Sequence, residues 1–374
     1  MKIAYDYQIF NLQQYGGISR YICELATQIA SLTEFEVKIL AGLYINQHLK
    51  NCSSDLVVGR SRRDIPKTVK ITSQINSQLS LIWYGINRPD VVHETYYSPN
   101  YLPRTPVPKS CPTVITVHDM IHEKFSNLAA EDEIVNSKAR AIKRADRVIC
   151  VSNNTKKDLI EILDLEPQRI SVIYPGYTLR ANNNSDAIAK EIENIIESPY
   201  ILYVGSRQPY YKNFARLLTA YGNRNQINQN FNLVCFGAEP LSQEEADLMR
   251  SLGLNEDKVL YIAGADGILA QLYRHASAFV YPSLYEGFGI PPLEAMSFDC
   301  PVVCSNTSSI PEVVGNAAEF FDPEEVESIA DSLEKVLFSS KHTKDLIELG
   351  KERIKHFSWS ACARQTSSVY LSLL

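Results

Sequence analysis

The sequence predicts an α/β protein built from two doubly wound, parallel-sheet domains. Short runs rich in Val, Ile and Tyr alternate with helical patterns along the chain, which is the element order of parallel α/β folds. These runs are dense in β-forming residues, as expected of strands covered by helices on both faces. The chain has 374 residues, and at roughly 150 residues per domain this length favours two domains.

Six strand candidates fall in each half of the chain. In the first half they cover residues 2–7, 35–40, 90–94, 113–119, 147–152 and 170–176. In the second half they cover residues 200–206, 231–238, 258–264, 278–283, 301–306 and 319–323. The Asn-rich, core-poor stretch 178–191 predicts a linker between them. We therefore expect one domain over 1–180 and a second over 190–357.

The composition excludes several classes of protein. Apolar residues make up 45% and charged residues 21%, so disordered, collagen-like and coiled-coil chains are excluded. A net charge of −6 argues against nucleic-acid binding as the main role. The eight cysteines are scattered, which predicts buried free thiols in a reducing compartment and no metal cluster. The first residues lack a signal-peptide core, and no apolar run approaches ~18 residues, so we expect a cytoplasmic protein.

The first motif follows the first strand, where Gly16 and Gly17 precede a helical pattern that starts near Ile18. Two glycines let the backbone approach a phosphate closely, and a helix N-terminus supplies free N–H groups. A plain flexible turn is the alternative. The motif is not GxGxxG, which weakens the case for a nicotinamide-dependent dehydrogenase.

Two further motifs follow strands of the second half. Gly205, Arg207 and Lys212 come directly after the strand at 200–206, and such a pair of cations suits a diphosphate, although an exposed pair of this kind is usually only solvated. After the strand at 278–283, Glu286 precedes a Gly-rich turn and a helix that carries Glu294. A glycine-rich helix entrance can receive a phosphate, and carboxylates accept hydrogen bonds from sugar hydroxyls.

The segments 286–296 and 301–323 resemble the retaining glycosyltransferases of family 4. The similarity continues, in order, at 15–21, 116–120, 148–159, 172–176 and 203–213. The combination is most similar to bacterial mannosyltransferases of polysaccharide and O-antigen assembly. Two features depart from the family pattern: a longer, Tyr-rich loop after Arg207, and Ser308 and Ser309 where glycines are common.

The resemblance implies a GT-B fold, in which two Rossmann-like domains face a central cleft. The first domain would bind the acceptor, the second would bind the nucleotide sugar, and a C-terminal helix at about 358–374 would cross back to the first. The implied reaction moves a hexosyl unit, with mannose from GDP-mannose as the leading donor, to a glycan or a lipid-linked acceptor with retention of configuration. UDP-glucose or a related donor with a small sugar acceptor remains an alternative, as does a non-catalytic scaffold that binds a nucleotide sugar. No cofactor, metal ion or nucleic-acid partner is expected.

The resemblance also assigns roles to individual residues. The catalytic group would be His118, Arg207, Lys212 and Glu286. The donor would be bound by Gly16, Gly17, Gly205, Phe288, Gly289, Ile290 and Glu294. The acceptor is also expected to meet Asp119 and, from their position after the strand at 90–94, the tyrosines Tyr96, Tyr97 and Tyr101, whose rings could stack on sugars. Core filling is an equal alternative for the tyrosines. A packed or capping role is the alternative for His118, because histidines at strand ends often have one.

A lipid-linked acceptor would bring the protein to the inner face of the membrane. The basic stretches 67–74 and 138–147 are the candidates for contact with anionic lipid. A solvated helix face is the alternative for both stretches.

Overall fold

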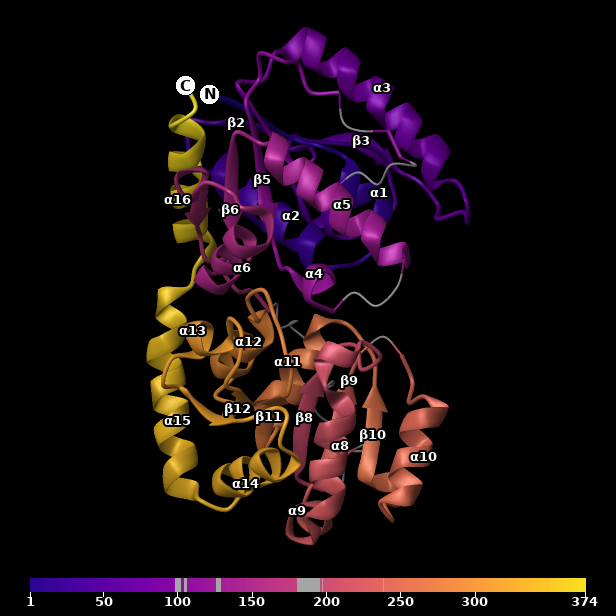
Figure 1. Ribbon diagram of the computed structural model, residues 1–374, viewed down its shortest axis with the longest axis vertical. Helices are drawn as coiled ribbons and strands as arrows, with labels where there is room; N and C mark the ends of the chain where they lie inside the picture. Colours follow the sequence, from indigo (N-terminus) through magenta and orange to yellow (C-terminus); the bar gives the residue numbers. More distant parts are fainter. Residues whose placement is uncertain (98–101, 104–105, 126–128, 180–195, 197, 238) are drawn as a thin grey trace. The chain divides into compact units, whose positions relative to one another are not determined.

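The computed structural model describes residues 1–97, 102–103, 106–125, 129–179, 196, 198–237 and 239–374 (Figure 1). The chain divides into two compact units, which we call unit 1 (residues 1–176 and 357–374) and unit 2 (residues 177–356). The predicted linker at 178–191 falls almost entirely outside the described residues.

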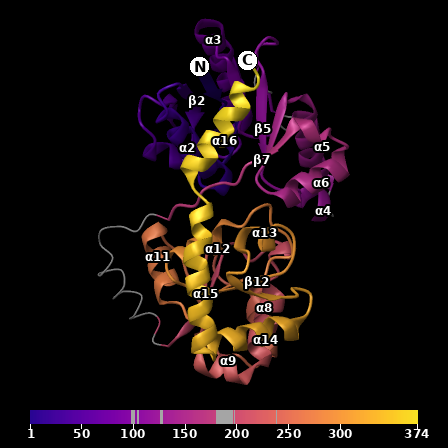
Figure 2. The ribbon, with the colours of Figure 1, turned by 90° about the vertical axis from the view of Figure 1, so that its left-hand side faces the viewer.

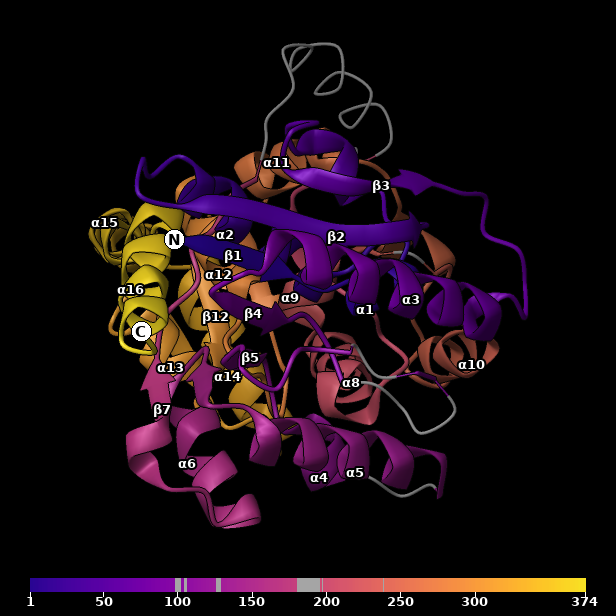
Figure 3. The same ribbon diagram turned by 90° about the horizontal axis from the view of Figure 1, so that it is seen from above.

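Unit 1 is a seven-stranded parallel sheet in the order β3-β2-β1-β4-β5-β6-β7. Figure 3 shows β2, β1, β4 and β5 following one another across it. Its strands are β1 (Lys2–Tyr5), β2 (Glu36–Tyr44), β3 (Val57–Ser61), β4 (Val91–Glu94), β5 (Thr113–Val117), β6 (Arg147–Cys150) and β7 (Ile170–Val172). Its helices are α1 (Gln8–Leu12), α2 (Gly17–Ala30), α3 (Val69–Asn87), α4 (Ile121–Phe125), α5 (Ala129–Arg144), α6 (Asn153–Leu163) and α16 (Trp359–Leu371).

Unit 2 is a six-stranded parallel sheet in the order β10-β9-β8-β11-β12-β13. Its strands are β8 (Tyr200–Val204), β9 (Asn232–Phe236), β10 (Val259–Ile262), β11 (Ala278–Tyr281), β12 (Val302–Ser305) and β13 (Ala318–Phe321). Its helices are α8 (Phe214–Asn223), α9 (Asn225–Asn230), α10 (Gln243–Ser251), α11 (Asp266–His275), α12 (Ile290–Ser297), α13 (Ile310–Val314), α14 (Val326–Leu337) and α15 (Ser340–Arg353). A short 3₁₀ helix, η3 (Tyr210–Lys212), follows β8.

The predicted fold class is confirmed, because each unit has the doubly wound strand order expected of a Rossmann-like domain. One strand of unit 1 was not predicted. β3 (Val57–Ser61) lies at the sheet edge and is mostly exposed, so it lacks the continuous apolar run by which the buried strands are recognised. That the two domains face a central cleft stays a prediction from the sequence.

The C-terminal helix α16 packs against α2 in unit 1 (Figure 2). The Tyr370 hydroxyl lies 2.9 Å from the Tyr5 hydroxyl and 2.6 Å from His93 Nδ1. His93 Nε2 lies in turn 2.9 Å from the Thr116 hydroxyl. Because these groups are buried, their mutual hydrogen bonds offset the cost of removing them from water. The network therefore joins the last helix of the chain to β1, β4 and β5.

Each sheet has one switch point, where the chain reverses the direction in which strands are added. It lies between β1 and β4 in unit 1 and between β8 and β11 in unit 2. Loops that leave the carboxyl ends of these neighbouring strands diverge and leave a crevice in which ligands of such sheets bind. The loops after β8 and β11 are therefore the place to look for a site in unit 2.

Candidate functional site

Lys212 and Glu286 meet at the switch point of unit 2. Lys212 follows β8 and Glu286 follows β11, and Lys212 Nζ lies 2.7 Å from Glu286 Oε1. The same oxygen accepts a 2.7 Å hydrogen bond from the Ser283 hydroxyl. The two charged side chains are 18% and 11% exposed, so the ion pair is largely screened from water but remains within reach of a ligand.

The loop that carries Lys212 is held in place by Asn213. This residue has a left-handed backbone conformation (φ 59°) at the entrance to α8. Its amide Nδ2 donates to the carbonyl oxygens of Pro282 at 3.0 Å and Pro323 at 2.7 Å. The Leu284 N–H also donates to the Tyr211 carbonyl at 2.7 Å. The loops after β8 and β11 are therefore joined by backbone as well as by the ion pair.

The Glu286 loop is fastened to a serine turn after β12. The Glu286 N–H donates to the Ser308 hydroxyl at 3.0 Å. The Ser309 hydroxyl donates to the carbonyls of Glu286 at 2.8 Å and Phe288 at 2.9 Å. Ser308 has a φ of 54°, a region that favours glycine. The two serines that depart from the family pattern thus supply side-chain hydrogen bonds that glycines cannot make.

Helix α12 begins at this loop. Gly289, its N-cap, has a φ of 100°, a backbone conformation that other residues adopt only with strain. Pro291 and Pro292 follow Ile290 and have no N–H, so the backbone N–H groups that a ligand could meet at this helix entrance are those up to Ile290. Glu294 is buried one turn further along.

Gly205 follows β8 and lies beside Gly237, which follows β9. The Gly205 N–H donates to the Phe236 carbonyl at 2.9 Å, and Gly205 has a φ of 135°. A Cβ atom on Gly237 would lie 2.8 Å from the Gly205 carbonyl oxygen, which is too close for any other residue. This pair of glycines lets the ends of β8 and β9 approach each other.

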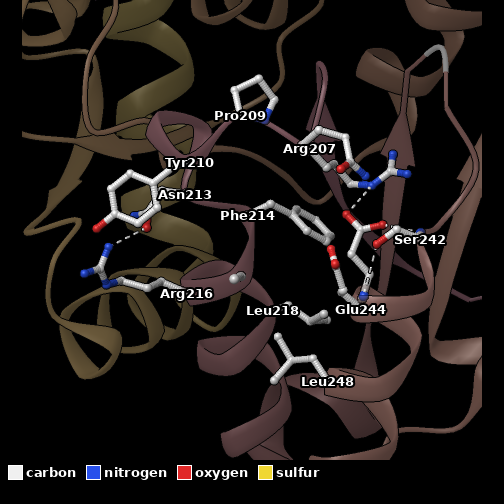
Figure 4. Close-up of a pocket in the computed structure, with 13 residues that line it drawn as sticks. Arg207, Pro209, Tyr210, Asn213, Phe214, Arg216, Leu218, Ser242, Glu244 and Leu248 are labelled. Atoms are coloured by element: carbon white, nitrogen blue, oxygen red, sulfur yellow. Dashed lines mark hydrogen bonds and ion pairs between the residues drawn. The ribbon is translucent and has the colours of Figure 1, made fainter. Parts of the chain in front are cut away.

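Arg207 lies in a different environment from the exposed cation that its sequence position suggested. Its side chain is 1% exposed, and Nε donates to Glu245 Oε1 at 2.9 Å. Nη2 donates to the carbonyls of Glu239 and Pro240, both at 2.7 Å. The guanidinium therefore fastens the turn before α10. It also lines a cavity of about 450 Å³ between η3, α8 and α10, with Phe214 and Leu248 on its walls (Figure 4).

In unit 1, Gly16 and Gly17 stand at the N-terminus of α2. Gly16 is the N-cap and makes no side-chain cap. A Cβ atom on Gly17 would find no atom within 4 Å among the described residues, so open space lies beside the first turn. Uncapped N–H groups next to open space suit an anion or a sugar hydroxyl.

His118 follows β5 and packs against α2. Its ring lies edge-on to the ring of Tyr21, with 4.9 Å between the centroids. Burial lowers the pKa of His118 to about 4, partly offset by the nearby Asp119 carboxylate. The imidazole is therefore neutral at pH 7. Nε2 is buried and has no hydrogen-bond partner among the described residues.

Of the predicted acceptor residues that the structure describes, the two tyrosines pack inside unit 1 and the aspartate caps the start of α4. Tyr97 is buried and its ring lies 5.6 Å from Lys138 Nζ, while Tyr96 is partly buried and packs against the main core of unit 1. Asp119 Oδ1 accepts from the N–H of Ile121 at 3.1 Å at the start of α4. Tyr101 lies outside the described residues.

The basic stretch 138–147 is solvated only in part: Arg140 and Lys143 are exposed, whereas Lys138 and Arg144 pair with acidic side chains. Lys138 is 1% exposed and pairs with Glu123 at 2.8 Å, and Arg144 pairs with the buried Glu94. These partners lie 15 and 50 residues away. Periodicity cannot reveal such pairs, because it describes only one element at a time.

Sequence reasoning also missed several residues that support the site, namely Ser283, Asn213 and Gly237. None of them was assigned a role from the sequence, although Asn213 lies in the segment 203–213 and Ser283 ends the strand candidate 278–283, because their contacts join different loops. Within the described residues, no group of three or more His, Cys, Asp or Glu side chains is arranged to hold a metal ion. All eight cysteines lie in the described part of the chain, and each is a free thiol. Among the helices described, none is both long and apolar enough to cross a bilayer.

Comparison with known proteins identifies both units. A family model described as Glycosyltransferase Family 4 matches residues 15–180, and one described as Glycosyl transferases group 1 matches residues 184–353. The chain is 28% identical over 379 residues to O-antigen chain mannosyltransferase B of Escherichia coli, with 95% of each chain covered. It is 25% identical over 348 residues to O-antigen chain mannosyltransferase RfbU of Salmonella typhimurium, covering 88% of this chain and 90% of the relative.

Solved structures share the fold at lower identity. Sucrose-phosphate synthase from Thermosynechococcus elongatus superposes with a TM-score of 0.74 at 17% identity, covering 100% of this chain and 98% of the other. Anabaena HepE in complex with UDP and glucose superposes with a TM-score of 0.72 at 17% identity, covering 100% and 99%.

Proposed function

The chain belongs to the glycosyltransferases of the GT-B fold and is a hexosyltransferase. From this premise we propose that it transfers mannose from GDP-mannose with retention of configuration. The proposed acceptor is a growing glycan or a lipid-linked glycan. One observation supports mannose and a glycan acceptor, namely that two O-antigen mannosyltransferases are similar to this chain over most of its length. The Lys212–Glu286 pair at the switch point of unit 2 supports a diphosphate-containing donor.

The ion pair of Lys212 with Glu286 carries the proposal. A lysine ammonium is a compact charge that can turn from a carboxylate to a diphosphate oxygen, and Glu286 would then accept hydrogen bonds from hydroxyls of the donor sugar. The two residues stand 2.7 Å apart, so a single ligand can engage both. Arg207, covered by its partners Glu239, Pro240 and Glu245, would position the loops rather than touch the donor.

The start of α12 would bind the rest of the donor. Backbone N–H groups near Phe288, Gly289 and Ile290 would meet the diphosphate, because a helix N-terminus favours negative charge. Glu294, one turn further along the same helix, would accept hydrogen bonds from the ribose hydroxyls. Gly205 would allow close approach of the backbone.

Unit 1 would supply the acceptor side and part of the reacting centre. The uncapped α2 N-terminus at Gly16 and Gly17 would meet the diphosphate or the donor sugar. The neutral His118 would hydrogen-bond the sugar as positive charge develops on the sugar. It would not act as a general acid, because at pH 7 the imidazole is not in its protonated, cationic form. Tyr96, Tyr97 and Asp119 would border the acceptor.

The proposed step breaks the bond between the mannose C1 and the diphosphate oxygen, whose electron pair leaves with GDP. The acceptor hydroxyl oxygen forms its new bond to C1 on the same face of the sugar, and its proton passes to the departing phosphate. The transition state resembles an oxocarbenium ion. Lys212 and the helix N-termini would stabilise the charge that grows on the leaving group. No metal ion takes part on this proposal, so activity should survive chelation by EDTA.

A thermal-shift series with GDP, UDP and ADP tests the donor, since a ligand that binds only the folded form raises the melting temperature. We expect the largest rise with GDP and its loss in Glu294→Ala. A rise with UDP alone would favour a UDP-glucose-type donor. Turnover is tested by transfer from labelled GDP-mannose to a synthetic glycan acceptor, and absence of both transfer and donor hydrolysis would refute the proposed reaction.

The proposed location is the cytoplasm, with access to the membrane for a lipid-linked acceptor. The eight free thiols fit a reducing compartment.

A further inference from the structure

Helix α3 (Val69–Asn87) carries its apolar residues on the outside. Five large side chains form one stripe along it and are all exposed to solvent: Ile71 (60%), Ile75 (42%), Leu79 (47%), Ile82 (60%) and Ile86 (76%). The residues follow one another at intervals of three or four, so they share one helix face. Contiguous exposed apolar surface of this kind marks an interaction site on a folded protein.

The inner face of the same helix is polar and is held by hydrogen bonds. Asn76 Oδ1 accepts from the Leu43 N–H at 2.7 Å, and its Nδ2 donates to the Leu43 carbonyl at 3.1 Å. The Thr72 hydroxyl donates to Asn11 Oδ1 at 2.9 Å, and Asn11 Nδ2 donates to the Ser73 hydroxyl at 2.8 Å. Turning the helix to bury its isoleucines would break these buried hydrogen bonds. These buried hydrogen bonds therefore keep the apolar stripe on the outer side of the helix.

An apolar cavity continues the stripe into unit 1. It has a volume of about 350 Å³ and lies between α3 and the strands β2 and β3. Leu79, Ile82 and Ile86 of the stripe line it together with Val58 and Trp83. The cavity and the stripe form one apolar surface, which we call the α3 face.

Cations border the α3 face at both ends. Between residues 60 and 88 the chain has six Lys or Arg residues and one acidic residue, Asp64, although the whole chain has a net charge of −6. Lys67 and Lys70 stand at the N-terminal end of α3 and are exposed. Cations there oppose the helix dipole, so helix stability does not explain them. Arg88, also exposed, borders the other end.

We propose that the α3 face docks on an anionic lipid bilayer, with the isoleucines entering the interface and the lysines and arginines meeting lipid headgroups. An amphipathic helix with a basic border binds membranes by this combination of apolar burial and charge. Figure 1 shows α3 along the margin of unit 1. The inference deepens the proposed function, on which it rests for its purpose, since it brings the enzyme to a lipid-linked acceptor.

Flotation of the full-length protein with vesicles tests the proposal. The wild type should float with vesicles of phosphatidylcholine and phosphatidylglycerol, less with phosphatidylcholine alone, and less at high salt. Ile82→Gln with Ile86→Gln should lower the partition coefficient about tenfold or more. Lys67→Gln with Lys70→Gln should lower it about fivefold per residue on the anionic vesicles only. Ile162→Gln is the matched control, an isoleucine of α6 that is 41% exposed.

Several outcomes would overturn the proposal. One is a wild type that does not float with the anionic vesicles. Another is an equal loss of flotation in Ile162→Gln. A third is sedimentation of the wild type as a dimer that Ile82→Gln with Ile86→Gln dissociates, without vesicle binding, since the face would then join two copies of the chain.

The readout is independent of the transferase reaction. Flotation needs neither donor nor acceptor, and the isoleucine variants should keep wild-type transfer to a water-soluble acceptor. Vesicle binding without any transfer would refute the proposed function but support membrane docking by the α3 face. Transfer without vesicle binding would support the proposed function and refute membrane docking by the α3 face.

Discussion

Breaking the Lys212–Glu286 ion pair separates its structural role from its chemical one. The perturbation is a double-mutant cycle of Lys212→Met, Glu286→Gln and the two together. In Lys212→Met, Glu286 keeps the 2.7 Å hydrogen bond from Ser283 but loses its cation. In Glu286→Gln, the lysine loses its carboxylate.

The size of the stability loss follows from the exposure of the pair. Exposed ion pairs contribute about 0–1 kcal/mol, and removal of one partner from a buried pair costs about 3–5 kcal/mol. These side chains are 18% and 11% exposed, which lies between the two cases, and the Ser283 hydroxyl still supports the carboxylate. We expect each single variant to lose about 2 kcal/mol. The double variant should lose about 1 kcal/mol less than the sum of the single losses, because contacting residues are coupled.

The changes in transfer activity across this cycle should differ from the changes in the free energy of unfolding. If Lys212 stabilises the departing diphosphate, its removal lowers kcat by about 10²–10³-fold. The double variant should lose less stability than the two single losses added together, but its turnover should stay as low as that of Lys212→Met. Urea unfolding gives the free energies, and initial rates with GDP-mannose give kcat. Recovery of turnover in the double variant would refute the reasoning, because it would mean that the lysine acts only by neutralising Glu286.

Three further outcomes follow from the site and its surroundings. Arg207→Ala should lower the free energy of unfolding by about 2–3 kcal/mol, because it removes the cation beside Glu245 and the donor to the Glu239 and Pro240 carbonyls. Urea unfolding checks this, and a neutral result would contradict the positioning role. Gly289→Ala should cost about 1–2 kcal/mol from its φ of 100° and weaken nucleotide binding, whereas an unchanged Kd by calorimetry would exclude the α12 entrance as part of the donor site. Burial lowers the pKa of His93 to about 3 and that of His118 to about 4. The folded state then binds fewer protons than the unfolded state below pH ~6.5, so stability falls on acidification by about 1.4 kcal/mol per pH unit for each histidine. His93→Gln should flatten the fall between pH 6.5 and 4.5 in urea unfolding, and an unchanged slope would refute it.

Much of the fold could be predicted because buried parallel strands are recognisable one at a time. Each of the twelve predicted strands overlaps a strand of the structure. β3 could not be found in this way, because its residues are exposed and its Gly59 breaks the β-forming pattern. Lys212 and Glu286 were also predicted as site residues from their positions after strands. Their direct contact was not, since it depends on β8 and β11 being neighbours although the two residues are 74 apart in the chain.

The same limit explains why two cations from one loop have different environments. Arg207 and Lys212 were indistinguishable in the sequence, each a cation shortly after β8. Arg207 meets Glu245, which is held by the capping box at the start of α10, and is covered. Lys212 meets Glu286 at the switch point and stays 18% exposed. Helix α3 shows the same dependence on partners that are distant in the sequence. Its periodicity establishes an amphipathic helix, but only the hydrogen bonds of Asn76 with a distant strand decide that the polar side faces inward. In each case the polar partners, which are distant in the sequence, determine which group is left for a ligand or a membrane.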